Sequence, residues 1–321
     1  MIKIYTILFI QVLFVIAQAH PVLKSIKNLS ANLSANLSTN PNSAMTGVDF
    51  KISLNPNLHS LKASADIRWN SLQKSFDFIL HRNLSIAPNE AYTIEQRPLQ
   101  DYAQSYRITF RIPQMQAYLD YQGLINEPIV DGQSPGIITD QGVSLLSESF
   151  WHPLFDTEVP WRVEVELPDS TWKVMIPGVR TQIDEYHVRF ESYTPVRDLA
   201  LVADRFQIFQ TFSGSGKWIQ VWLKNNEAAL AQSYLNLVPN YIDDYSSRIG
   251  AFPFSGYTVV ENSLETGYAF PGFTLLGPSV IRLPFLLRSS LPHEVLHSWW
   301  GNSVLVDYNR GNWCEGLTTY M

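Results

Sequence analysis

Residues 48–69 read VDFKISLNPNLHSLKASADIRW and set the expectation for the first half of the chain. Apolar and polar residues alternate over 48–54 and again over 63–69, as in strands that have one buried face. An Asn-Pro pair, typical of a turn, separates the two runs. The stretch therefore predicts two β-strands.

The same alternation continues to Leu223 in short runs separated by turn residues. These runs are FDFILH, YRITFRI, WRVEVELP, WKVMIP, YHVRFES, LALVADRFQIFQTF and KWIQVWL. Repeated short strands at this spacing predict a mostly antiparallel β saddle or sandwich, which we assign to residues 45–223.

Helical spacing begins after residue 224. The stretch NNEAALAQSYLNLVPNYIDDYSSRIG, residues 225–250, predicts a helix that Pro239 kinks or caps and that Gly250 ends. A strand (YTVVEN), a Gly/Pro-rich connection (GYAFPGFTLLG) and two further helices, from about Ser290 and from Asn312, follow. Residues 224–321 therefore predict a separate α+β domain, and the fold class of the whole chain is α+β.

Composition fits a folded protein that does not bind nucleic acid. Of 321 residues, 45% are hydrophobic and 16% are charged, as in globular domains. The net charge is -6 and no block of basic residues appears, so the electrostatic signature of a nucleic-acid-binding protein is absent. The one cysteine, Cys314, excludes an intrachain disulfide.

The N-terminus predicts export. MIKIYTILFIQVLFVIAQAH combines Lys3, an apolar run and Ala-Gln-Ala at 17–19, the features of a cleavable signal peptide over residues 1–19. The protein is therefore expected outside the cytoplasm, in a periplasmic or extracellular location. The alternative is an uncleaved membrane anchor, the only case in which a membrane would be a partner. Residues 20–44 form an Asn/Ser-rich leader, whose composition cannot bury a core.

SSLPHEVLHSWWGN, residues 289–302, carries the chemistry. Ser290 can cap a helix, with Pro292 in its first turn and Gly301 at its end. His293 and His297 would lie about 40° apart on one face, so both imidazoles can reach one Zn²⁺. Glu294, about 100° away, can instead contact a metal-bound water as a general base. The alternative is an ordinary helix that carries two histidines by chance.

A catalytic zinc ion needs a third protein ligand, and Glu315 is the candidate. Glu315 also fits a capping box with Asn312, which is its structural alternative. Cys314 could ligate instead, but a thiolate suits structural zinc better and one cysteine does not make such a site. We therefore expect one Zn²⁺ held by His293, His297 and Glu315.

HEVLHSWWGN followed by NWCEGLTTY resembles the zinc metallopeptidases of the aminopeptidase N and leukotriene A4 hydrolase type, the gluzincins. In that family the helix reads His-Glu-x-x-His-x-Trp-x-Gly-Asn. FWHPLFD, residues 150–156, resembles a segment of the family's β domain. The resemblance covers most of residues 45–321, the family's N-terminal part. It implies a β saddle and the start of a thermolysin-like catalytic domain. By position it implies metal ligands at His293, His297 and Glu315, and the base at Glu294.

The chain departs from the family at three places. There are 17 residues between His297 and Glu315, where the family more often has one more. Phe270 and Pro271 stand where the family's Gly-x-Met-Glu-Asn strand has the glutamate that holds a substrate's free amine; Glu261 and Glu265 lie nearby and could substitute. The family's transition-state tyrosine lies well downstream, so Tyr320 is not assigned that role. The third predicted helix has no stop signal before Met321, and we expect a longer enzyme truncated at its C-terminus.

These features predict a zinc-dependent, aminopeptidase-like metallopeptidase with a peptide substrate. Zinc would polarise the scissile carbonyl and lower the pKa of its bound water, while Glu294 would move the proton to the leaving amine. The alternative is a catalytically impaired, zinc-containing protein that binds peptides. An endopeptidase or an epoxide hydrolase-like enzyme on the same scaffold also stays open.

Overall fold

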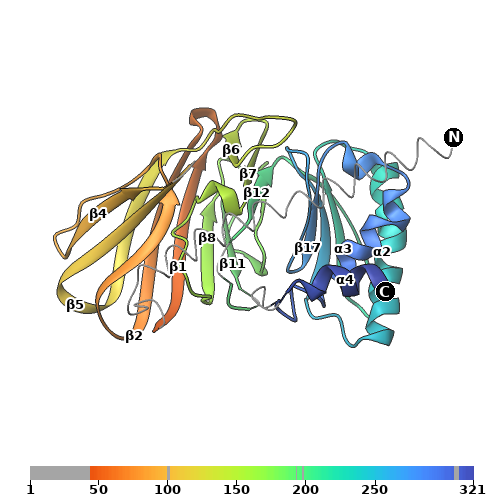
Figure 1. The fold of residues 1–321 in the computed structure, drawn as a ribbon. Coiled ribbons are helices and arrows are strands. Elements are labelled where there is room, and N and C mark those ends of the chain that lie inside the picture. The colour runs from red at the N-terminus through yellow and green to blue at the C-terminus, as the bar shows by residue number, and fades with distance from the viewer. Residues whose placement is uncertain (1–43, 100–101, 193, 197–198, 307–310) are drawn as a thin grey trace. The chain divides into compact units, whose positions relative to one another are not determined.

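The computed structural model describes residues 44–99, 102–192, 194–196, 199–306 and 311–321 (Figure 1). The predicted signal peptide, and the leader up to residue 43, lie outside these residues. The chain divides into two compact units, the first ending at Asp204 and the second spanning Arg205–Met321. None of the helices in the described part is long and apolar enough to cross a membrane.

The first unit is built on an eight-stranded sheet with the order β10-β11-β8-β1-β2-β5-β3, in which β4 also pairs with β5. The pairing of β1 with β8 is parallel, and the other pairings in this sheet are antiparallel. The strands are β1 (Met45–Asn55), β2 (Ser60–His81), β3 (Leu84–Ile86), β4 (Tyr92–Pro98), β5 (Ala103–Leu124), β8 (Trp161–Glu166), β10 (Val179–Gln182) and β11 (His187–Glu191).

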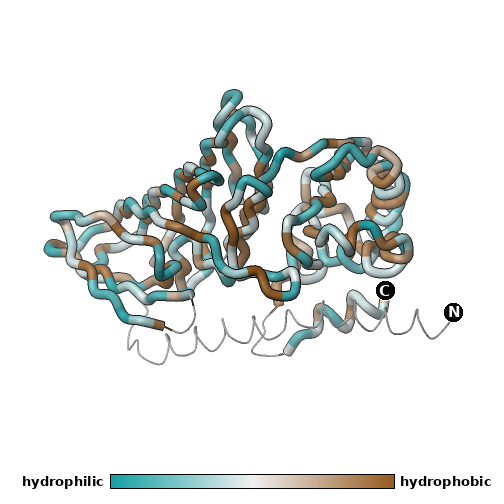
Figure 2. Tube along the Cα trace, turned by 90° about the horizontal axis from the view of Figure 1, so that it is seen from above, coloured by the Kyte–Doolittle hydropathy of each residue, from teal (hydrophilic) through white to brown (hydrophobic). Residues whose placement is uncertain are grey.

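Residues 48–69 form the two strands that their alternation predicts, and these strands pair antiparallel as a hairpin. Val48 pairs with Ile67, and both are buried. The opposite face of the hairpin carries Asp49, whose carboxylate accepts hydrogen bonds from Arg68 at 2.9 and 3.0 Å. Figure 2 shows the resulting change between hydrophobic and hydrophilic residues along the chain. A strand with one buried face therefore explains the sequence pattern.

A second, four-stranded sheet completes the first unit. Its order is β6-β7-β12-β9, and its side chains join the hydrophobic core of the larger sheet. Its strands are β6 (Gly136–Thr139), β7 (Gly142–Leu145), β9 (Lys173–Met175) and β12 (Leu201–Asp204). The FWHPLFD segment packs into this core, where Trp151 is fully buried and donates to the Leu199 carbonyl at 2.9 Å. Two sheets around one core confirm the predicted sandwich.

The second unit has a five-stranded mixed sheet with the order β13-β14-β15-β17-β16. Its strands are β13 (Gln207–Phe212), β14 (Trp218–Leu223), β15 (Gly256–Glu261), β16 (Gly267–Phe270) and β17 (Phe273–Leu276). The alternating pattern places residues 207–223 in the first domain. Instead, the β13–β14 hairpin belongs to the second unit, because β14 pairs in parallel with β15.

Three helices accompany this sheet: α2 (Ala228–Arg248), α3 (Ser290–Leu296) and α4 (Trp313–Tyr320). In Figure 1, α2 and α3 lie on one side of the strands, and α3 contacts both α2 and α4. Pro239 lies inside α2, and Gly250 follows the helix with φ +141°. Short 3-10 turns complete the described chain at Pro56–Leu58, Ser147–Ser149, Val280–Arg282 and Leu286–Arg288.

Residues 267–277 form a hairpin rather than the expected connection. β16 and β17 pair antiparallel, and Phe270 lies opposite Phe273. Gly272 in the turn has φ +86°, a backbone conformation that favours glycine. Among the described strands only β17 pairs with β16, so this short strand is the edge of the sheet. It contacts α3.

Candidate metal centre

His293 lies in α3, and His297 is the C-cap residue that follows the helix. The helix begins at Ser290, so Ser290 is its first residue rather than its cap, and Leu291 and Val295 are buried beneath it. The backbone N–H of His297 donates to the carbonyl of His293 at 3.2 Å. The two imidazoles therefore start one helical turn apart, as the spacing predicts.

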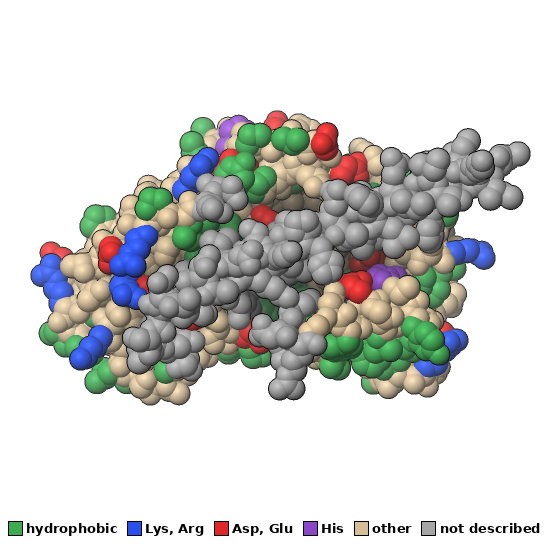
Figure 3. All heavy atoms as spheres, viewed as in Figure 1, with side chains coloured by type: hydrophobic (Ala, Val, Ile, Leu, Met, Phe, Trp, Pro, Cys, Tyr) green, Lys and Arg blue, Asp and Glu red, His purple; other side chains and the backbone are tan. Residues whose placement is uncertain are grey.

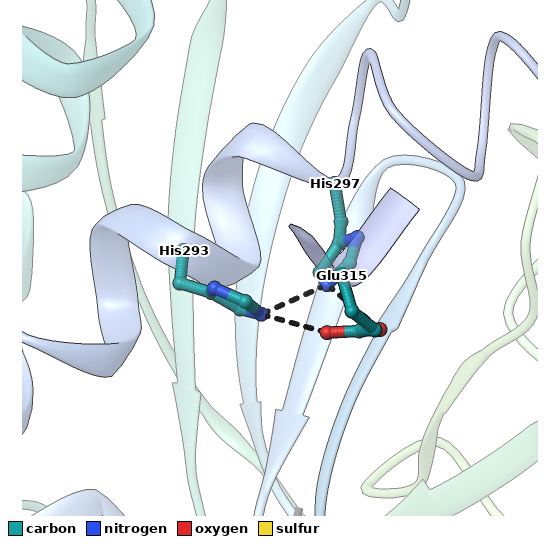
Figure 4. Close-up of side chains that lie close together, drawn as sticks. All are labelled: His293, His297 and Glu315. Carbon is teal, nitrogen blue, oxygen red and sulfur yellow. Dashed lines mark hydrogen bonds and ion pairs between the residues drawn. The ribbon is translucent and has the colours of Figure 1, made fainter. Parts of the chain in front are cut away.

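His293, His297 and Glu315 come together (Figure 4). The Nε2 atoms of the two histidines are 3.1 Å apart. Glu315 lies 3.3 Å from His293 Nε2 through Oε2 and 3.6 Å from His297 Nε2 through Oε1. One donor atom from each residue lies within 4.8 Å of the other two. Two imidazoles and one carboxylate are the donor set of many catalytic zinc sites, so these residues fit the metal.

The cluster is accessible from one side. The His293 and His297 side chains are 19% and 12% exposed, whereas Glu315 is 48% exposed. In the space-filling view (Figure 3), a histidine and acidic side chains reach the surface close together on the second unit. The site thus has partly buried imidazoles and an exposed carboxylate.

Glu315 is supplied by α4 and does not form the alternative capping box. Asn312 is the N-cap residue of α4 but makes no side-chain capping hydrogen bond. The ring of Trp313 packs edge-on against Trp300, with centroids 6.2 Å apart. The beginning of α4 is therefore attached to the turn that follows α3.

Cys314 lies on the opposite edge of the His297 ring from the cluster. Its Sγ is 3.4 Å from His297 Nδ1 and 3.1 Å from the Trp300 carbonyl oxygen. The cluster is formed at Nε2, so the thiol does not join the donor set. His297 Nδ1 lies 3.0 Å from the same carbonyl oxygen. That carbonyl and the thiol contact are two features of the site that the sequence pattern does not reveal.

Glu294 is buried next to the cluster. It is 4% exposed, and this burial raises the pKa of its carboxyl group from 4.5 to about 7, with a further increase from Glu315 and a decrease from His297. Tyr257 lies in β15. Its burial, and to a lesser extent the negative charge of Glu294, raise the pKa of its hydroxyl group well above 10.0. A carboxyl group with this pKa can accept or release a proton near neutral pH.

Glu261 and Glu265, the other candidate carboxylates, form hydrogen bonds within the second unit. Glu261 is 2% exposed, and it accepts from Arg282 at 2.7 Å and from the backbone N–H of Lys224 at 2.8 Å. Glu265 accepts from the backbone N–H of Ser279 at 3.1 Å. Both therefore hold loops of the second unit together. Tyr320 is 88% exposed.

Two curated proteins are similar in sequence. Aminopeptidase RNPEPL1 from Mus musculus is 25% identical over 254 residues, which cover 70% of this chain and 34% of the relative. Aminopeptidase RNPEPL1 from Homo sapiens is 24% identical over 254 residues, with 70% and 33% covered. The chain thus spans about a third of the length of these relatives. No family model matches the chain.

The fold is similar to that of a solved enzyme. A variant M1 zinc metallopeptidase from Deinococcus radiodurans, bound to a Tyr-Ser-Ala substrate, superposes with a TM-score of 0.52 and 14% identity. The match covers 82% of this chain and 65% of that one. It extends from the β-rich first unit into the α+β second unit. Sequence and fold together relate this chain to the N-terminal part of the M1 aminopeptidase family.

Proposed function

We propose that the chain contains the catalytic zinc site of an aminopeptidase-like metallopeptidase that hydrolyses peptide bonds. The observation that carries the proposal is the convergence of His293, His297 and Glu315 within 4.8 Å, next to the buried carboxyl group of Glu294. A structural zinc site would have no use for such a neighbouring proton acceptor. The aminopeptidase names of the two curated relatives support the same reaction class.

The roles of the residues follow from their chemistry. Zinc, when bound, would polarise the scissile carbonyl and make a water molecule more acidic. His293, His297 and Glu315 would hold the ion. Glu294 would take the proton from the attacking water and return it to the leaving amine. With its pKa raised to about 7, its carboxyl group is suited to both transfers near neutral pH.

The test compares two substitutions. Glu294→Gln is expected to bind zinc like the wild type and to lose peptide hydrolysis by at least about 100-fold, the usual contribution of a general base. His293→Ala is expected to lose zinc as well. Zinc content by mass spectrometry and cleavage of short peptides separate the two effects. Hydrolysis by Glu294→Gln at the wild-type rate would refute the role of Glu294.

A catalytically impaired protein that binds peptides is the second candidate. It is favoured by the end of the edge strand β16, where Phe270 and the following Pro271 replace the amine-binding residues of the family. In that case the zinc-loaded wild type would bind peptides, seen by calorimetry, but would not cleave them. Cleavage that depends on Glu294 favours the enzyme.

A further inference from the structure

The carbonyl oxygen of Trp300 is approached by two donors at once. His297 Nδ1 lies 3.0 Å from it, and the Cys314 thiol donates to it at 3.1 Å. Gly301 follows Trp300 with φ +101°, a conformation that lets the chain turn back here. A carbonyl oxygen has two lone pairs, so it can accept both hydrogen bonds.

This arrangement selects one tautomer of His297. If Nδ1 carries the proton and donates to the carbonyl, Nε2 keeps its lone pair on the side of His293 and Glu315. A histidine that binds a metal usually has its other ring nitrogen fixed in this way. In the metal-free chain, His293 Nε2–H can then donate across the 3.1 Å to His297 Nε2.

The thiol occupies the space in which water would compete for Nδ1. Cys314 is 3% exposed, and its Sγ is 3.4 Å from Nδ1. The thiol donates its proton to the Trp300 carbonyl oxygen at 3.1 Å. Removing the sulfur would leave a cavity beside Nδ1. A water molecule there would donate to Nδ1 and favour the tautomer with the proton on Nε2, which would weaken metal binding.

We propose that Cys314 is a positioning residue, which holds the Trp300 carbonyl and the His297 ring in the form that binds zinc. It also connects the two helices, because Cys314 precedes the ligand Glu315 on α4 and touches the end of α3. The inference rests on the proposed zinc site, and adds a residue that lies outside the donor cluster.

Three variants test the role. Cys314→Ala removes the thiol, and Cys314→Ser keeps a hydroxyl donor. Thr318→Val is the matched control, since Thr318 is buried on the same helix and donates to the Cys314 carbonyl at 2.8 Å but is not among the partners of His297. Two properties are measured on the whole chain: the imidazole tautomers by ring-nitrogen NMR without metal, and the zinc dissociation constant by chelator competition.

We expect Cys314→Ala to show a mixture of His297 tautomers and about tenfold weaker zinc binding, the lower end of the range for residues that orient a ligand. Cys314→Ser should stay within about threefold of the wild type. Thr318→Val should match the wild type in both properties, even if its melting temperature falls as far as that of Cys314→Ala. A merely structural role would move only the melting temperature.

Two results would overturn the inference. One is a Cys314→Ala variant with the wild-type tautomer and with zinc affinity equal to that of Thr318→Val. The other is a sulfur-to-metal charge-transfer band in the cobalt-loaded wild type that Cys314→Ser abolishes, since the thiol would then be a ligand. Failure of the proposed function is distinguishable: the tautomer change would persist in a chain that hydrolyses no peptide.

Discussion

Replacing Glu294 with glutamine should stabilise the metal-free chain at alkaline pH. Glu294 is buried, and its carboxyl group has its pKa raised from 4.5 to about 7, chiefly by loss of solvation. Glutamine has nearly the same shape and no charge. The ionised form of Glu294 is thus expected to destabilise the folded chain.

The size of the effect follows from the pKa. A tenfold change in an equilibrium corresponds to about 1.4 kcal/mol, so raising the pKa from 4.5 to about 7 represents roughly 3 kcal/mol. Because the folded-state value is the higher one, the unfolded chain loses this proton first as the pH rises. Stability therefore decreases between about pH 4.5 and pH 7. At about pH 8, Glu294→Gln should have a free energy of unfolding roughly 3 kcal/mol higher than the wild type, reduced by the cost of burying the new amide group. At about pH 4 the two free energies of unfolding should be equal.

Urea unfolding of the metal-free chain at both pH values, followed by tryptophan fluorescence, measures the effect. Glu90→Gln serves as the control, because Glu90 is an exposed glutamate of the first unit and its replacement should change little at either pH. Equal stabilities of Glu294→Gln and the wild type at alkaline pH would refute the reasoning. A gain of the same size at both pH values would also do so, because it would have a cause other than ionisation.

Three further predictions concern the second unit. Asp243, on α2, accepts hydrogen bonds from the backbone N–H groups of Gly214 at 2.7 Å and of Ser215 at 3.2 Å. Asp243→Asn should therefore lower the free energy of unfolding by about 1–2 kcal/mol. The control Asp244→Asn, at an exposed position, should not lower it. Burial raises the pKa of Asp243, but its hydrogen bonds outweigh this and lower the pKa below 3.8. In denaturant titrations, the difference in stability between the wild type and Asp243→Asn should therefore disappear as the pH falls through that lowered pKa. Gly301→Ala should weaken zinc binding in chelator competition, because φ is +101° and the new methyl would lie 3.0 Å from the sulfur of Cys314; unchanged affinity would contradict this. Zinc at about one hundred times its dissociation constant should stabilise the wild type by about 2.7 kcal/mol in urea unfolding, and should leave His293→Ala unchanged.

Local patterns predict the strands and helices well, because each reflects burial of one face. Residues 48–69 form a hairpin, and residues 225–250 contain α2. The partner of a strand is a non-local property. Residues 207–223 alternate like the strands before them, yet pair with β15 in the second unit. Pro271 and Gly272 indicate a turn, but the short flanking strands around them are defined only by their pairing.

The candidate site shows the same division. The spacing of His293 and His297 is local, and it predicts their common face. The approach of Glu315 is not local, and was expected from the chemistry of zinc rather than from spacing. The Trp300 carbonyl belongs to the backbone, so no residue type reports it. The burial of Glu294 depends on packing of α3 on the sheet, which no short pattern determines.

Two tyrosines of α2 support the segment that leads into α3, so the geometry of the site depends on residues outside it. Tyr234 donates to the Ile281 carbonyl at 2.7 Å, and Tyr241 donates to the Leu287 carbonyl at 2.8 Å. Both acceptors lie in the segment that leads into α3. A mutational scan scored by zinc content would therefore record losses at both tyrosines, although neither belongs to the donor cluster. Conservative replacement by phenylalanine would distinguish such supports from ligands, since the ring remains while only the hydroxyl is lost.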